Sequence, residues 1–247
     1  MSDMRNATIA DVAPFDDPAR TDDAASRVAP MGTTKIRPYT LGEEIANSVI
    51  HGLGATLSIS ALTMLIVFAA QAHNPWALAS AIVFGVSLVL EYTASTLYHA
   101  FPQEKAKHVF KILDHCGIYL LIAGSYTPFT LVTLRESGGL WLFAVVWGLA
   151  IVGISVEAFW TYRPRWLSAA VYLGMGWLVV VAIKPLAASL PAAGLWLLVA
   201  GGLCYTVGTA FYVLKKVRYM HAVWHVWVFA GSVLHFLAVL LFVIIPS

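Results

Sequence analysis

The chain has 247 residues, of which 60% are hydrophobic and only 11% are charged, and its mean hydropathy is +0.77. An ordinary soluble domain carries about 25% charged residues, so this composition excludes one and indicates a polytopic membrane protein. The net charge of +2 excludes nothing by itself, whereas the two cysteines, Cys116 and Cys204, are too few for a disulfide framework or a thiolate metal site.

Residues 1–38 differ in composition from the rest of the chain. They contain six aspartates, five basic residues and four prolines, and few large apolar side chains. Such a segment cannot bury enough apolar surface to offset the entropy lost on ordering, so we expect a disordered cytoplasmic tail. No apolar core follows the first residues, and we therefore expect no cleavable signal peptide.

Seven apolar runs follow, and each reaches the roughly 20 residues that a helix needs to span a bilayer. The runs cover about residues 45–70, 75–98, 111–134, 140–160, 166–187, 191–214 and 220–245. Irregular backbone would find no hydrogen-bond partners in the hydrocarbon, so helices are expected throughout. The boundary between the fifth and sixth runs is the least clearly marked. The predicted fold class is all-α, with seven transmembrane helices in residues 39–247.

The basic residues indicate how these helices are oriented. Thirteen of the fifteen lysines and arginines precede the first run or lie between runs two and three, four and five, or six and seven. Lys105, Lys107 and Lys111 are placed between runs two and three, and only Arg135 and Lys184 fall on the opposite side. The positive-inside rule therefore predicts a multi-pass protein of the inner or plasma membrane with a cytoplasmic N-terminus. G-protein-coupled receptors have the opposite orientation and are excluded.

Ionisable and polar residues inside the predicted spans gather at the cytoplasmic ends of four helices. Ionisable groups within membrane spans are unfavourable and mark functional sites by default. The first helix opens with Glu44, Asn47 and His51, the second closes with Glu91, Ser95 and His99, the third opens with Asp114 and His115, and the seventh opens with His221 and His225. The predicted topology places all of these side chains at the same depth.

His221 and His225 are four residues apart, so they share a helix face with Cβ atoms about 5–6 Å apart. Two such imidazoles can bind one metal ion, although a pair of histidines at a helix end can equally be interfacial polar residues. A catalytic zinc takes three protein ligands and leaves a fourth position for water. With His99 as the third imidazole, the sequence predicts a Zn²⁺ site.

Asp114 and Ser95 are the predicted catalytic residues of this site. Asp114 would act as a base or orienting acceptor for the water, and Ser95 would hydrogen-bond the water or a substrate carbonyl. Two simpler interpretations stay open: Ser95 can bond back to the carbonyl of Glu91, and Asp114 can pair with Lys111.

Glu44, Asn47 and His51 share one face of the first helix and are predicted to support the site. Glu44 can also be no more than a favourable acid in a first helical turn. His235 lies roughly 15 Å along the helix from His225, too far to share its metal, and we expect it to form an interhelical hydrogen bond.

Three further residues are placed outside the predicted ligand set. His115 points to a different face from Asp114 and is left out of the site. Glu91 and Glu157 are each expected to line a cavity or to pair with a buried polar group.

The combined pattern resembles that of the hemolysin III family, the bacterial branch of the progestin and adipoQ receptor family that includes the adiponectin receptors. The residues that carry the resemblance are Glu44-x-x-Asn47-x-x-x-His51, Ser95-x-x-x-His99 with Asp114 following, and His221-x-x-x-His225. Residues 124–129 and His235 are also similar to the family's pattern, and the resemblance covers about residues 39–245.

The resemblance implies seven helices, a cytoplasmic N-terminus, and a zinc ion on the three predicted histidines near the cytoplasmic leaflet. It also implies kinship with alkaline ceramidases, and hence a zinc-dependent hydrolase of a lipid amide. Two alternatives stay open: a non-enzymatic receptor or regulator of membrane-lipid homeostasis with structural zinc, and a membrane-lytic hemolysin. Membrane lipids are the expected substrate or ligand, no nucleic acid partner is expected, and the sequence does not determine the oligomeric state.

Overall fold

The computed structural model describes residues 39–160, 163–214 and 217–246, which are almost entirely helical and contain no β-strand. In chain order the elements are α1 (Leu41–Gln71), α2 (Pro75–Ala100), α3 (Glu104–Pro128), η1 (Phe129–Thr133), η2 (Arg135–Ser137), α4 (Gly139–Phe159), α5 (Arg165–Gly176), η3 (Trp177–Ala182), α6 (Ile183–Ser189), α7 (Ala192–Val213), α8 (Met220–Val239) and η4 (Leu240–Ile244). Within the described residues, seven helical stretches are long and apolar enough to cross a membrane. The predicted all-α seven-helix fold is therefore confirmed, whereas the predicted tail, residues 1–38, lies outside the described residues.

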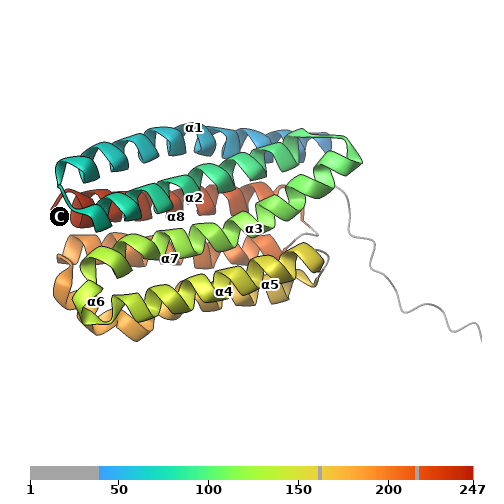
Figure 1. The fold of residues 1–247 in the computed structure, drawn as a ribbon. Helices are drawn as coiled ribbons and strands as arrows, with labels where there is room; N and C mark the ends of the chain where they lie inside the picture. The colour runs from blue at the N-terminus through green and yellow to red at the C-terminus, as the bar shows by residue number, and fades with distance from the viewer. Residues whose placement is uncertain (1–38, 161–162, 215–216, 247) are drawn as a thin grey trace, which may run out of the picture. The chain divides into compact units, whose positions relative to one another are not determined.

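The helices lie side by side along one direction, as Figure 1 shows. α1 packs on α2, α2 on α3, and α3 on α4, while α7 packs on both α5 and α8. Contacts between α1 and α8 bring the first and last helices together. As a result, the end of α2 and the starts of α1, α3, α5 and α8 lie at one end of the bundle.

The helix α1 shows how the bundle distributes polar and apolar side chains. Asn47 and His51 are buried, whereas Val49 and Leu53 on the opposite face are 64% and 56% exposed. Lipid tails are as apolar as leucine, so an exposed apolar face suits contact with the bilayer. The face that carries the predicted supporting residues consequently points into the protein.

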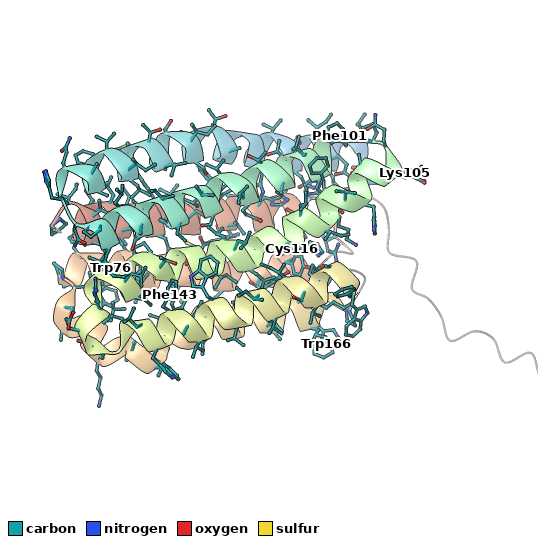
Figure 2. All side chains as sticks on the ribbon, viewed as in Figure 1. Trp76, Phe101, Lys105, Cys116, Phe143 and Trp166 are labelled. Atoms are coloured by element: carbon teal, nitrogen blue, oxygen red, sulfur yellow. The ribbon has the colours of Figure 1, made fainter. Side chains whose placement is uncertain are left out.

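The structure differs from the prediction at the start of the third helix and inside the fifth span. The helix α3 begins at Glu104, so Lys105, Lys107 and Lys111 lie within its first two turns rather than between helices. Figure 2 shows Lys105 at the end of the bundle where α3 begins. Long basic side chains can extend to water from a helix that has already entered the membrane interface. The first turns of α3 can therefore carry lysines, and the apolar run in the sequence begins later than the helix. The fifth span was predicted as one helix, but it contains the 3₁₀ segment η3 between α5 and α6.

A second set of charged side chains lies buried between α3, α4 and α5. Glu157 of α4 is fully buried, and its two carboxylate oxygens pair with Arg163 at 2.6 Å and with His115 Nδ1 at 2.8 Å. Arg163 also donates to the hydroxyls of Tyr119 and Ser168. This set accounts for Glu157, which pairs with buried polar groups as expected.

The ion pair between Glu157 and Arg163 leads to a stability prediction. Glu157→Ala is expected to destabilise the protein by about 3–5 kcal/mol, because it leaves the buried Arg163 charge without its partner. The double variant Glu157→Leu/Arg163→Met removes both charges and is expected to recover much of this loss. Thermal unfolding of the three purified proteins in one detergent measures the effect, and a double variant no more stable than the single one contradicts it.

Candidate metal centre

Three histidines from two helices meet at the end of the bundle where α2 ends and α8 begins. His99 is the second-to-last residue of α2, and His221 and His225 lie in the first two turns of α8. One nitrogen of each ring lies within 4.8 Å of the corresponding nitrogens of the other two. His99 and His225 are buried, and His221 is half-buried. The structure thus brings the three predicted metal ligands into one cluster.

One pair of imidazole nitrogens has the spacing expected for two ligands of a single zinc ion. Nε2 of His99 and Nε2 of His225 are 3.2 Å apart, close to the roughly 3.3 Å expected for two nitrogens bonded to one tetrahedral zinc at 2.0–2.1 Å. Both ring nitrogens of His221, and Nδ1 of His225, are buried without a hydrogen-bond partner among the described residues. Buried polar atoms are normally paired, and a bound cation would provide one nitrogen of each ring with a partner. The histidine cluster therefore fits a zinc ion.

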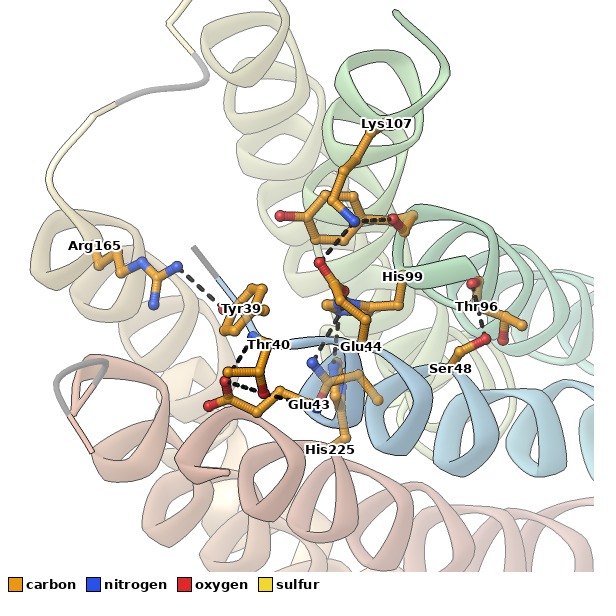
Figure 3. A network of polar contacts seen from close by, with 12 residues as sticks. Tyr39, Thr40, Glu43, Glu44, Ser48, Thr96, His99, Lys107, Arg165 and His225 are labelled. Carbon is orange, nitrogen blue, oxygen red and sulfur yellow. Dashed lines mark hydrogen bonds and ion pairs between the residues drawn. The ribbon is translucent and has the colours of Figure 1, made fainter. Parts of the chain in front are cut away.

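A carboxylate fixes the orientation of the His99 ring. Nδ1 of His99 lies 2.6 Å from Glu44 Oε2, and the other Glu44 oxygen accepts from Lys107 at 2.7 Å (Figure 3). A metal-bound histidine usually donates its second ring N–H to a carboxylate in this way. The contact assigns the proton to Nδ1 and leaves Nε2 to face His225. Glu44 is therefore more than an acid in a first helical turn.

The other two predicted supporting residues also lie beside the cluster. Nδ2 of Asn47 lies 3.4 Å from Nδ1 of His99, and because Nδ1 donates its proton to Glu44, this is a close contact and not a hydrogen bond. The His51 ring stands edge-on to the His225 ring, with centroids 3.7 Å apart, and its far side contacts Tyr92. Neither nitrogen of His51 has a hydrogen-bond partner among the residues that the structure describes.

The predicted catalytic residues lie near this end of the bundle, but among the described residues neither forms a hydrogen bond or ion pair with the three histidines. Ser95 is fully buried one turn before His99, and its hydroxyl has no partner among the described residues. It therefore does not bond back to Glu91, which was the simpler interpretation. Asp114 is 6% exposed and lines a cavity that also reaches His51, His221 and His225, whereas Ser95 is not among the residues that line this cavity.

The cavity has a volume of about 160 Å³ and extends away from the histidines between α3, α5, η3, α7 and α8. Its polar end carries the histidines and Asp114, whereas the rest of its wall is mainly apolar, with Leu121, Phe129 and Leu198 among the lining residues. Leu121 and Phe129 lie progressively further along α3 and η1 from Asp114. The cavity is therefore mainly apolar and includes two of the three cluster histidines in its lining.

Glu91 belongs to the cavity wall, which was one of its two expected roles. Its carboxylate faces Gly117 of α3, where a Cβ atom would overlap Oε2, so only glycine leaves room for it. Oε2 is buried without a hydrogen-bond partner among the described residues. Glu91 also interacts electrostatically with Asp114, and the cavity therefore carries two carboxyl groups.

The prediction for His235 was wrong in one respect. Its Nδ1 bonds to the carbonyl of Gly231 one turn earlier in the same helix, at 2.8 Å, rather than to another helix. The Tyr205 ring of α7 packs against it, with centroids 5.2 Å apart. Helical histidines can satisfy a ring nitrogen locally, and spacing along the sequence does not distinguish this from an interhelical bond.

The sequence analysis did not identify Tyr39 as part of the site. This residue precedes the first helix, and its ring stacks on the His221 ring with centroids 5.1 Å apart. The only sequence signal was its position immediately before Thr40, which caps α1 through a reciprocal bond with Glu43. A single aromatic residue before a helix cap does not predict contact with a helix 180 residues later.

Comparison with known proteins agrees with this description. The model of the family described as haemolysin-III related matches residues 39–236. The "Hemolysin-3 homolog" of Bacillus subtilis (strain 168) is 48% identical over 204 residues, covering 83% of this chain and 96% of the relative. "Hemolysin-3" of Bacillus cereus is 47% identical, covering 82% and 92%. The human "Monocyte to macrophage differentiation factor" is 27% identical, covering 81% and 84%. No solved structure matches the chain.

The family match begins before α1, ends within α8 and includes all three histidines of the cluster. Two bacterial relatives share nearly half of their residues with it over almost their full length. The seven apolar spans make the protein a multi-pass membrane protein. The chain belongs to the haemolysin-III related family.

Proposed function

We propose that this protein is a zinc-dependent hydrolase of a lipid amide that acts at the cytoplasmic leaflet. The observation that supports it best is that two histidines of the cluster, His221 and His225, line a mainly apolar cavity together with Asp114. Burial of methylene groups in such a cavity contributes about 0.8 kcal/mol each, so an acyl chain is a suitable occupant. With the chain in the apolar part, an amide at its head would lie beside the histidines and Asp114.

Each residue of the site has a separate role in the proposed amide hydrolysis. His99, His221 and His225 would hold the zinc ion, which when bound supplies a Lewis acid that polarises a carbonyl and makes water more acidic. The Asp114 carboxylate takes a proton from the attacking water and passes it to the departing amine nitrogen. The Ser95 hydroxyl donates to the substrate carbonyl oxygen. The C–N bond breaks as the new C–O bond forms, and the products are a fatty acid and an amine.

Glu44 has a positioning role in this scheme. Its bond to His99 Nδ1 keeps the opposite nitrogen directed toward His225. The ion pair with Lys107 in turn holds the Glu44 carboxylate in place. This chain of contacts joins α1, α2 and α3, so the orientation of His99 depends on the packing of all three helices.

Purified, zinc-loaded protein in lipid nanodiscs, incubated with ceramides and other N-acyl lipids, tests the proposal. Release of free fatty acid that disappears in His225→Ala supports the hydrolase. His73→Ala is a matched control, because His73 is an exposed histidine in the turn between α1 and α2. If no N-acyl lipid is hydrolysed although zinc is bound, the non-enzymatic regulator with structural zinc becomes the better hypothesis.

The proposed leaflet depends on the orientation of the bundle. A reporter fused before Tyr39 is expected to be cytoplasmic, and one fused after Ser247 periplasmic or extracellular, because thirteen of the fifteen basic residues lie on one side of seven spans. Paired alkaline phosphatase and green fluorescent protein fusions measure this. Both reporters on the same side would contradict the seven-span topology, and an inverted result would move the site to the outer leaflet.

A further inference from the structure

The Tyr39 side chain lies across the histidine cluster at the end of the bundle. Its ring stacks on His221 at a centroid distance of 5.1 Å and an angle of 24°, and it meets His99 edge-on at 5.8 Å. Its hydroxyl accepts a hydrogen bond of 3.3 Å from Arg165, the first residue of α5 (Figure 3). Tyr39 therefore contacts two of the three cluster histidines on one side and the start of α5 on the other.

The chain immediately after Tyr39 is anchored through Glu43. The Thr40 backbone N–H donates to Glu43 Oε2 at 2.8 Å. The other Glu43 oxygen accepts from the backbone N–H of Tyr219 at 3.0 Å. Tyr219 adopts a left-handed conformation with φ of 61° and directly precedes α8, two residues before His221. The start of α1 is thus tied to the start of the helix that carries two of the histidines.

The Tyr39 hydroxyl anchors the ring at the end away from the histidines. It accepts from the guanidinium of Arg165, while the ring of this half-buried residue lies against His221 and His99. Arg165 is itself held by the backbone carbonyl of Tyr212, at 3.4 Å, so Tyr39 bonds to a fixed partner.

The two sides of the histidine cluster differ in how they are closed. On one side Tyr39 covers His221 and His99, while on the other the cavity continues between α3, α5 and α7 with mainly apolar walls. A polar molecule at the helix ends would have to displace Tyr39 to reach the cluster. A molecule with an acyl chain can reach it through the cavity.

We infer that Tyr39 is an access-determining and positioning residue, which closes the metal site at the helix ends and leaves the apolar cavity as the route for reactants. The inference rests on metal binding by the histidines, and hence on that part of the proposed function, but not on hydrolysis. In this inference, the hydrogen bond from Arg165 to the Tyr39 hydroxyl keeps the Tyr39 ring over His221.

The rate at which zinc leaves the protein tests this directly. Zinc-loaded protein in nanodiscs is mixed with an excess of a soluble, lipid-insoluble chelator, and the coloured complex is followed with time. Tyr39→Ala is expected to release zinc at least about 10-fold faster than the parent, in line with the 10–100-fold effects of residues that support metal ligands. Tyr39→Phe keeps the ring but loses the hydroxyl that accepts from Arg165, and Arg165→Gln removes the charged partner of that hydroxyl. Both variants are therefore expected to release zinc at rates between those of the parent and Tyr39→Ala.

Matched controls distinguish closure of the metal site by Tyr39 from a general loss of packing at this end of the bundle. Phe110→Ala removes an aromatic ring at the same end of the bundle that stacks on Phe101 rather than on a histidine, and it is expected to leave the release rate of zinc unchanged.

Unchanged zinc release in both Tyr39→Ala and Arg165→Gln overturns the inference even if hydrolysis is observed. If Tyr39→Ala does not fold, Arg165→Gln decides alone. A parent protein that binds no zinc overturns the metal site itself, together with the proposed function, whereas bound zinc without hydrolysis leaves the closure by Tyr39 intact.

Discussion

The parent protein is expected to bind about one zinc ion per chain, and the double variant His221→Ala/His225→Ala is expected to bind none. The two substitutions remove two of three ligands and leave His99 as the only imidazole of the cluster. A single neutral histidine does not retain zinc through purification, so the loss should be complete. Metal analysis by mass spectrometry of both proteins, after gel filtration in a metal-free buffer, measures it.

Each single substitution of the three histidines is also expected to empty the site, because two protein ligands fall short of the usual three. His235→Ala is the matched control, since it removes a buried histidine from the same helix that lies outside the cluster. It should keep its zinc. Stoichiometric zinc in the double variant would show that the ion, if any, binds elsewhere.

Asp114→Asn is expected to keep its zinc and lose most of its hydrolytic activity. Asparagine preserves the shape of the side chain and one acceptor oxygen but removes the charge and the basicity. Proton transfer by a positioned side chain contributes about 10²–10⁴-fold to a rate, so the turnover of an N-acyl lipid should fall by that factor. The measurement compares fatty-acid release and bound zinc in the same preparations of the parent and the variant.

Bound zinc in Asp114→Asn distinguishes a loss of catalysis from a loss of the metal ion. Asp114 lies in the cavity wall outside the histidine cluster, so its loss should affect the chemistry more than the ion. Full activity in Asp114→Asn would remove this residue from the mechanism. A parent that binds zinc but hydrolyses no N-acyl lipid would favour the regulator, in which Asp114→Asn should leave membrane-lipid homeostasis nearly unchanged.

The number and approximate positions of the helices could be read from the sequence because the bilayer imposes a minimum apolar length. The boundaries were less predictable where a helix passes through the interface. The first turns of α3 contain Lys105, Lys107 and Lys111, and a hydrophobic run does not include them although the backbone is already helical. The 3₁₀ segment η3 was missed for a related reason, since the residues 177–182 are apolar in either helix type.

The histidine pair of α8 was predictable because residues four apart share a helix face whatever the surrounding fold. The placement of His99 beside that pair needed only one more argument, the common depth of the helix ends. The bond between Glu44 and His99, at 2.6 Å across two helices, required the tertiary structure. Sequence spacing says which face a side chain occupies, but not which neighbour it reaches.

The sequence by itself determined the class of fold, the set of candidate ligands and the end of the bundle where they gather, because hydrophobic length, helical period and charge asymmetry are local properties of the chain. Only the tertiary structure showed that Tyr39 lies over His221, that Glu91 and Asp114 share one cavity, and that Glu157 pairs with Arg163. These contacts depend on how neighbouring helices rotate and approach one another. Packing across the whole bundle sets that rotation, and no single segment of the sequence encodes it.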